Sequence, residues 1–207
     1  MIRRFRKDEN GSVMVEMTIS IVLLLMLTLG FVDFGHAYYQ WNAAAKAVQV
    51  GARLASISDP VATNLTGAGP TDTPGAPVEA GDFAAFVCTS AGGGTCGGFS
   101  AANFSRIFRG DTAFTNDDAC PDIQGSQRPG MCHFFPGLRR ASVRITYSAS
   151  GLGYQTRPDG PVPTITVSLQ NVSFRFFFLG GLLGFNNIAM PSMLSTVTGE
   201  DMKSTAP

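Results

Sequence analysis

The sequence predicts an α+β protein: a long N-terminal helix that spans a membrane and continues as an amphipathic helix, packed on a small antiparallel β-sheet with long loops. Three observations lead to this fold: a long, nearly uncharged run near the N-terminus, apolar residues at helical spacing after it, and alternating apolar residues late in the chain. We expect four segments: a leader at residues 1–11, the spanning and stalk helix at 12–57, a loop or linker at 58–82, and an extracytoplasmic α+β domain at 83–207.

The nearly uncharged run covers residues 12–32, 21 residues in which Glu16 carries the only charge. A helix rises about 1.5 Å per residue, so this length crosses the ~30 Å hydrocarbon core of a bilayer. The first charge after the run is Asp33, and the run is preceded by the basic residues Arg3, Arg4, Arg6 and Lys7. Because basic flanks stay in the cytoplasm, we expect the chain after the span to lie outside.

The position of Glu16 within the run is unusual, because an ionised carboxylate in a membrane-spanning helix is costly unless it is paired. Glu16 is the fifth residue after Gly11, which closes a short leader that begins with basic residues. This arrangement resembles the processing site of type IV prepilins. The resemblance implies that a membrane peptidase cuts after Gly11 and that Ser12 becomes the mature amino terminus.

Cleavage would supply a partner for Glu16. An α-ammonium group at Ser12 of one subunit is a suitable ion-pair and hydrogen-bond partner for the buried carboxylate of a neighbour. A second interpretation stays open, in which Glu16 lies at the headgroup boundary of an uncut signal anchor that spans the membrane with residues 17–37. In that case water solvates the carboxylate, and no assembly role follows.

The helix is predicted to continue well past the span. Apolar and small residues recur there at spacings of 4 and 3, at Phe34, Tyr38, Trp41, Ala45, Val48, Ala52 and Ala55. We expect this stripe to pack against the chain's own domain. The helix should end near Ile57, because Pro60 disfavours helical geometry at Asp59.

Several features of this N-terminal segment occur together. After Gly11 and Glu16 come a Leu-rich span, an acid-Phe-Gly element at residues 33–35, an aromatic pair at 38–39 and a Gly-Ala-Arg element at 51–53. Over residues 11–57 the sequence therefore resembles the opening of TadE-like proteins, minor pilins or pseudopilins of the tight-adherence (Flp) type IV pilus system.

This resemblance implies a location and partners. The chain would cross the bacterial inner membrane once, with a cytoplasmic N-terminus and a periplasmic C-terminal domain. Its partners would be other pilins or pseudopilins, the pilus assembly platform and the prepilin peptidase. The resemblance leaves open whether the subunit enters the surface fibre, primes it or stays at its base.

The rest of the chain predicts a domain rich in loops. Residues 59–82 carry four prolines and no hydrophobic periodicity, so we expect an exposed loop. Residues 83–87 have a short helix-like pattern, and Ser100 can cap a brief helix. The inner face of that helix would hold Phe104, Ile107 and Phe108.

Two late segments predict β-strands. Residues 143–147 and 165–169 alternate between apolar and polar side chains, as half-buried strands do. The alternation changes phase after Gln170, so we expect a β-bulge near Asn171 or a bend between sheets. Residues 174–185 are apolar but short and interrupted by glycines, which favours a core strand followed by an exposed hydrophobic loop. A loop that contacts the membrane is the alternative.

The cysteines indicate the compartment rather than catalysis. All four follow the span, where an oxidising space favours two disulfides. Three connectivities are possible among them. We expect the local pairing because both pairs bracket loops rich in Gly or Pro: Cys88 with Cys96, and Cys120 with Cys132. The spacing does not suit a zinc finger, so we expect neither a metal nor a cofactor.

Composition and motifs favour a structural protein. Fifteen basic and fifteen acidic residues cancel, so nothing indicates nucleic acid as a partner. His133 follows Cys132 directly, but adjacency in a loop does not make a nucleophile and base, and no phosphate-binding or hydrolase motif occurs. We expect a non-enzymatic minor pilin or pseudopilin. The alternative is an uncleaved, signal-anchored envelope protein whose outer domain binds a ligand.

Overall fold

The computed structural model describes residues 2–90, 94–112, 114–184 and 188–203. It contains two compact units. The helical unit comprises Met1–Gln40 and Ser173–Ala189, and the sheet unit comprises Trp41–Val172 and Met190–Pro207. Helix α1 contributes residues to both units.

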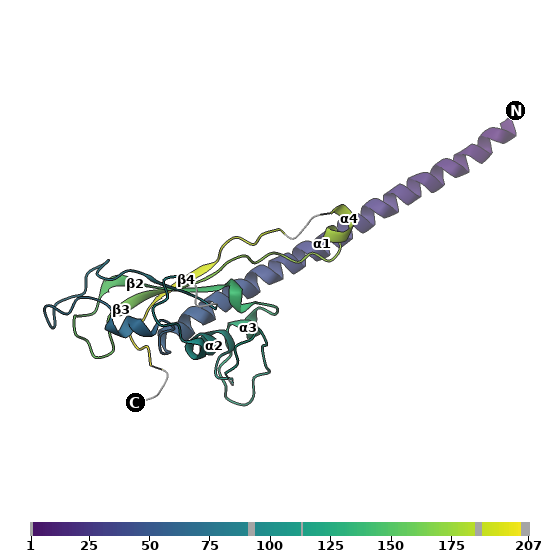
Figure 1. Ribbon diagram of the computed structural model, residues 1–207. Coiled ribbons are helices and arrows are strands. Elements are labelled where there is room, and N and C mark those ends of the chain that lie inside the picture. The colour runs from purple at the N-terminus through teal and green to yellow at the C-terminus, as the bar shows by residue number, and fades with distance from the viewer. Residues whose placement is uncertain (1, 91–93, 113, 185–187, 204–207) are drawn as a thin grey trace. The chain divides into compact units, whose positions relative to one another are not determined.

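Helix α1, Ile2–Ser56, is continuous (Figure 1). It ends one residue before the predicted position and four residues before Pro60. The predicted long N-terminal helix is therefore confirmed. Gly11–Ser56 is long and apolar enough to cross a membrane, and none of its most apolar window is buried.

Among its described residues, the sheet unit contains four antiparallel strands in the order β1-β2-β3-β4. These strands are β1 Phe86–Thr89, β2 Val143–Leu152, β3 Val162–Leu169 and β4 Leu194–Thr198. The two predicted strands are the central ones, and Tyr147 pairs with Ile165 in the register between them. Ile145, Tyr147, Ile165 and Val167 are fully buried, so the predicted alternation marks the face that packs inward.

The outer strands were not predicted. The helix-like pattern at residues 83–87 was wrong, because Phe86 and Cys88 pair with Tyr147 and Ile145 as part of β1. Strand β4 pairs with β3 and alternates only between exposed and half-buried residues, with none fully buried. Both strands lie at sheet edges, where one side of the backbone has no neighbour in the sheet.

Short helices complete the sheet unit. Helix α2, Ala101–Arg109, is capped by the Ser100 side chain as predicted, with Phe104, Ile107 and Phe108 buried. The other short elements are η1 Thr63–Gly67, α3 Met131–Phe134 and η2 Arg140–Ser142, and the helical unit adds α4 Leu179–Leu183.

Two predictions about the loops need correction. The segment expected to be an exposed loop begins inside the core, since Val61, Ala62 and Leu65 are buried. The register irregularity lies between Ala149 and Leu152 of β2 and not near Asn171. Asn171 instead has a left-handed backbone (φ 54°) that bends the chain after β3, a conformation that Asn tolerates better than most residues.

The stripe of α1 is only partly buried. Val48, Ala52 and Ala55 are in the core, but Phe34 and Tyr38 are 65% and 71% exposed, so the prediction that these aromatic residues pack inward was wrong. In the sheet unit the buried face of α1 carries small residues, and a Cβ added at Gly51 would collide with the Met131 side chain. Small residues let the helix approach its neighbours closely.

Candidate functional site

The residues of the predicted processing site lie on α1. Ser12 and Glu16 are four positions apart and therefore on one face of the helix, and both are exposed. A Cβ added at Gly11 would meet nothing within 4 Å. Packing within the described part of the chain thus gives no reason for glycine at this position.

The helix surface around Glu16 is apolar and open. Val13 is 63% exposed, Met17 62% and Ile19 55%. The hydroxyl groups of Thr18 and Thr28 donate to helix carbonyls of Met14 and Leu25, at 2.8 and 3.0 Å. A carboxylate has no proton to donate in this way, so Glu16 cannot be satisfied by the carbonyls of its own helix.

A second carboxylate, Asp33, is fully buried within the helical unit. Its Oδ1 accepts a hydrogen bond from the backbone N–H of Phe177 at 2.9 Å. Its Oδ2 accepts from the N–H groups of Phe178 and Leu179, at 2.9 and 2.6 Å. We call this arrangement the Asp33 cap, because it satisfies the N–H groups where α4 begins.

The charged form of Asp33 is the one that this geometry favours. Three backbone N–H donors converge on its two oxygens, and hydrogen bonds of this kind favour the charged form of a carboxyl. The His36 ring also lies 4.6 Å, centroid to centroid, from the Phe177 ring. Asp33 thus holds residues 177–179 against α1 as an ionised group.

Gln40 forms a second link in the helical unit. Its Nε2 donates to the Arg175 carbonyl at 2.9 Å, and its Oε1 accepts from the Arg175 N–H at 3.0 Å. Sequence reasoning missed Asp33 and Gln40 as anchors of the later segment. The sequence does contain a signal for these anchors. Asp33 and Gln40 are seven positions apart and therefore lie on one face of the helix, and both are polar residues of a largely apolar helix.

The four cysteines form two local disulfides in the sheet unit, Cys88–Cys96 and Cys120–Cys132. Cys120, Cys132 and His133 have ligand atoms within 4.8 Å of one another. The two sulfurs are bonded to each other and cannot act as thiolate ligands in this state. His133 Nδ1 accepts from the Gly130 N–H, and its Nε2 contacts the Pro121 carbonyl at 2.8 Å.

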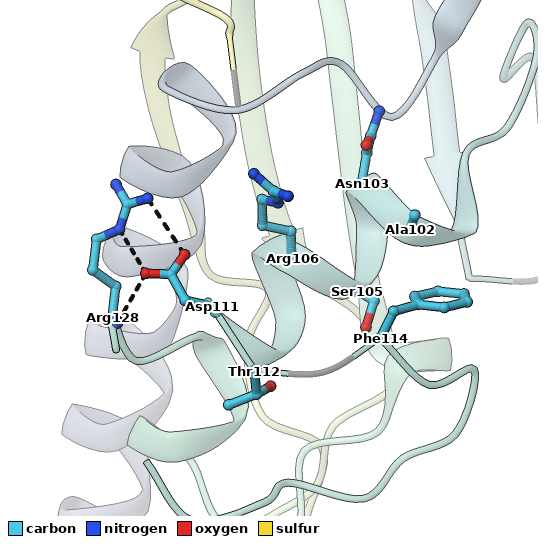
Figure 2. A pocket seen from close by; sticks show the side chains of 9 residues that line it. Ala102, Asn103, Ser105, Arg106, Asp111, Thr112, Phe114 and Arg128 are labelled. Atoms are coloured by element: carbon cyan, nitrogen blue, oxygen red, sulfur yellow. Dashed lines mark hydrogen bonds and ion pairs between the residues drawn. The ribbon is translucent and has the colours of Figure 1, made fainter. Parts of the chain in front are cut away.

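A cleft of about 400 Å³ lies beside α2 in the sheet unit. Figure 2 shows the side chains that line it. At its side Arg128 holds the Asp111 carboxylate with Nε at 3.0 Å and Nη2 at 3.3 Å. The Arg128 hydrogen bond, against the smaller effect of burial, keeps the pKa of Asp111 below its ordinary value. The Ser105 hydroxyl donates to the Thr115 carbonyl and not to a base, which gives no support for nucleophilic catalysis.

The cleft, the cysteine pairs and the predicted processing site are separate features. Gly11, Ser12 and Glu16 lie on α1 of the helical unit, whereas the disulfides and the cleft belong to the sheet unit. Within the described residues, α1 is the one helix long and apolar enough to span a membrane, which fits a single-pass membrane protein.

Comparison with known protein families agrees with a single-pass membrane protein. Residues 11–53 match the family model described as TadE-like protein, which confirms the resemblance over that segment. No curated protein and no solved structure matches the chain. The matched segment contains Gly11, Glu16, Asp33 and Gln40 and ends three residues before the end of α1. The match links the N-terminal helix to a pilus-associated family.

Proposed function

We propose that this protein is a minor pilin or pseudopilin that takes part in assembly of a tight-adherence (Flp-type) pilus, with a structural and non-enzymatic role. The observation that carries the proposal is Glu16, a lone carboxylate on an exposed apolar helix surface inside the segment that matches TadE-like proteins. Such a surface is suited to packing against other apolar helices once the carboxylate has a partner.

The proposed mechanism begins with cleavage after Gly11. The cut removes the basic leader and creates an α-ammonium group at Ser12. In an assembly, this group on one subunit pairs with Glu16 of a neighbour, so that two charges that are each costly in an apolar environment neutralise each other. The pairing would set the register between neighbouring helices, since an unpaired carboxylate disfavours other registers.

The proposed location and partners follow from the same segment. The protein would sit in the inner membrane with its N-terminus in the cytoplasm, because the basic residues precede the span, and with its sheet unit in the periplasm. The prepilin peptidase would act on Gly11–Ser12. Other pilins or pseudopilins and the assembly platform would contact the helix. The two disulfides fit an oxidising compartment.

The test is Glu16→Gln, which keeps side-chain size and hydrogen bonding but removes the charge. Membrane fractionation should show normal insertion, while cross-linking to other pilin subunits and the number of pili should fall. Glu79→Gln is the matched control, because Glu79 is also exposed but lies outside the matched segment. Normal piliation and normal cross-linking with Gln at position 16 would exclude an assembly role for this carboxylate.

The second candidate is an uncleaved, signal-anchored envelope protein whose outer domain binds a ligand. The observation that favours it is the cleft of about 400 Å³ in the sheet unit, with polar side chains from α2 and the loop at Asp111. This candidate predicts that Glu16→Gln has no effect on assembly and that changes at the cleft, such as Thr112→Trp, abolish binding of a surface ligand. The state of the mature amino terminus separates the two candidates.

A further inference from the structure

A short apolar segment is fixed beside the point where α1 leaves its predicted span. Residues 176–181 contain no charged residue, and the Asp33 cap binds residues 177–179 to α1. We propose that the side chains of Phe177 and Phe178, together with Phe31 and Phe34 of α1, form a second membrane-contacting surface in the bilayer interface. The proposal rests on the membrane-spanning role of α1 in the proposed function.

The depth of the segment follows from the Asp33 cap. Residues 12–32 are sufficient to cross the hydrocarbon core, so Asp33 is the first residue beyond it. The N–H groups of Phe177 and Leu179 lie 2.9 and 2.6 Å from the Asp33 carboxylate oxygens. These residues are therefore held at the level of the membrane surface, whatever the position of the sheet unit.

The surface itself is apolar and exposed. Phe177 is 64% exposed, Phe178 42% and Ile188 51%, next to a small apolar hollow of about 80 Å³ that Phe34, Phe176, Leu179 and Ile188 line. On α1, Phe31 and Phe34 are 71% and 65% exposed. Apolar area facing water is unfavourable, so covering these rings with lipid is favourable.

Backbone polar groups of the segment have hydrogen-bond partners within the protein, as an environment with little water requires. An unsatisfied N–H group in lipid is costly, and membranes admit irregular backbone only where its polar groups have partners. Asp33 satisfies three such N–H groups, and the Phe174 N–H donates to the Ile188 carbonyl at 2.9 Å. Tyr38 and Tyr39, both exposed, follow on α1, where interfacial aromatic residues are expected.

Lipid is the occupant that these observations favour. The aromatic surface continues the apolar surface of the predicted span without an intervening exposed charge, since Asp33 is buried under the segment. Interfacial elements of this kind bury an apolar face about 5–10 Å into the headgroup boundary. A helix of another pilin covering the same rings is the competing occupant, and the experiment separates it from lipid.

The experiment uses tryptophan fluorescence in the full-length chain, which has a single tryptophan, Trp41. In a Trp41→Phe background, one tryptophan is placed at a time by Phe177→Trp, Leu24→Trp or Phe114→Trp. Each protein is reconstituted at low density into phosphatidylcholine vesicles whose acyl chains carry bromine either near the headgroup or near the chain end. Bromine quenches only tryptophans that it touches.

We expect the fluorescence of the Phe177→Trp variant to fall more with bromine near the headgroup than with bromine near the chain end. Leu24→Trp, in the middle of the span, should lose more with deep bromine, and Phe114→Trp, in the sheet unit and 54% exposed, should lose none. Phe178→Trp gives an independent reading of the same surface, so one badly folded variant does not decide the result.

Quenching at Leu24→Trp without quenching at either phenylalanine position would overturn the membrane-contacting surface and leave the anchor intact. Quenching of both phenylalanine positions by deep bromine alone would overturn the interfacial placement. If Leu24→Trp is not quenched, α1 does not span the membrane, and both proposals are contradicted. Quenching at positions 177 and 178 that is present at low protein density and lost at high density would favour a protein occupant over lipid.

Discussion

The hydroxyl oxygen of Tyr147 accepts a hydrogen bond from the backbone N–H of Val61 at 3.0 Å, and both residues are fully buried in the sheet unit. Tyr147 lies on a central strand, and Val61 follows the end of α1. This bond connects the segment after the helix to the sheet, so it explains why that segment lies in the core and does not form an exposed loop.

Tyr147→Phe should destabilise the protein, because the substitution leaves the Val61 N–H buried without its acceptor. The free energy of unfolding should fall by about 1–3 kcal/mol. Tyr154→Phe is the matched control, since Tyr154 is 49% exposed and its loss should change stability by less than about 0.5 kcal/mol. Denaturant titration followed by circular dichroism measures both, and equal effects of the two variants would contradict the role of this bond.

The same tyrosine predicts a pH dependence at alkaline pH. Burial raises the pKa of the Tyr147 hydroxyl, more than the Val61 hydrogen bond lowers it. The unfolded chain releases this proton near pH 10 while the folded chain keeps it, so the contribution of Tyr147 is complete below about pH 10 and is lost as the pH rises toward the folded-state pKa. The stability difference between wild type and Tyr147→Phe should therefore shrink above pH 10. A constant difference up to pH 12 would argue against the raised pKa.

Gly11→Leu should prevent removal of the leader, because a protease site that accepts only a glycine at this position excludes a side chain. Mass spectrometry of the amino terminus should find Ser12 in the wild type and the full-length chain in the variant. Gly30→Leu is the matched control, since a Cβ there also meets nothing within 4 Å on the same helix. A mature form that begins at Ser12 in Gly11→Leu would defeat the assignment of the cleavage site.

The disulfides should stabilise the sheet unit. Cys88 and Cys96 are 8 residues apart and Cys120 and Cys132 are 12 apart, so each closed loop contributes about 2–3 kcal/mol in the chain-entropy model. Non-reducing peptide mapping of protein from the cell envelope should recover these two pairs. If the mapping finds four free thiols, the two disulfides are contradicted, and so is the argument for an oxidising compartment.

Asp33→Asn should weaken the Asp33 cap. An amide offers one acceptor oxygen and places an NH₂ donor against the remaining N–H groups. Hydrogen exchange should therefore become faster at Phe177, Phe178 and Leu179. The Phe174 amide, bonded to the Ile188 carbonyl, is an internal control that should change less. Unchanged exchange at all four amides would show that Asp33 does not hold this segment.

The sequence alone determined the elements whose signals are local. Composition and length of residues 12–32 predicted the N-terminal helix, Ser100 and the apolar spacing after it predicted α2, and alternation of side chains predicted the central strands β2 and β3. Each of these signals is read within one segment, because the period of a helix or a half-buried strand is fixed by its own backbone.

Only the tertiary structure decided which residues are buried between distant segments. Asp33 is buried and Phe34 exposed because the N–H donors that the carboxylate needs come from residues 177–179, more than 140 positions away. The edge strands β1 and β4 were missed for a related reason. Each has one neighbour in the sheet and at most one buried residue, so its identity depends more on the strand it pairs with than on an apolar face of its own.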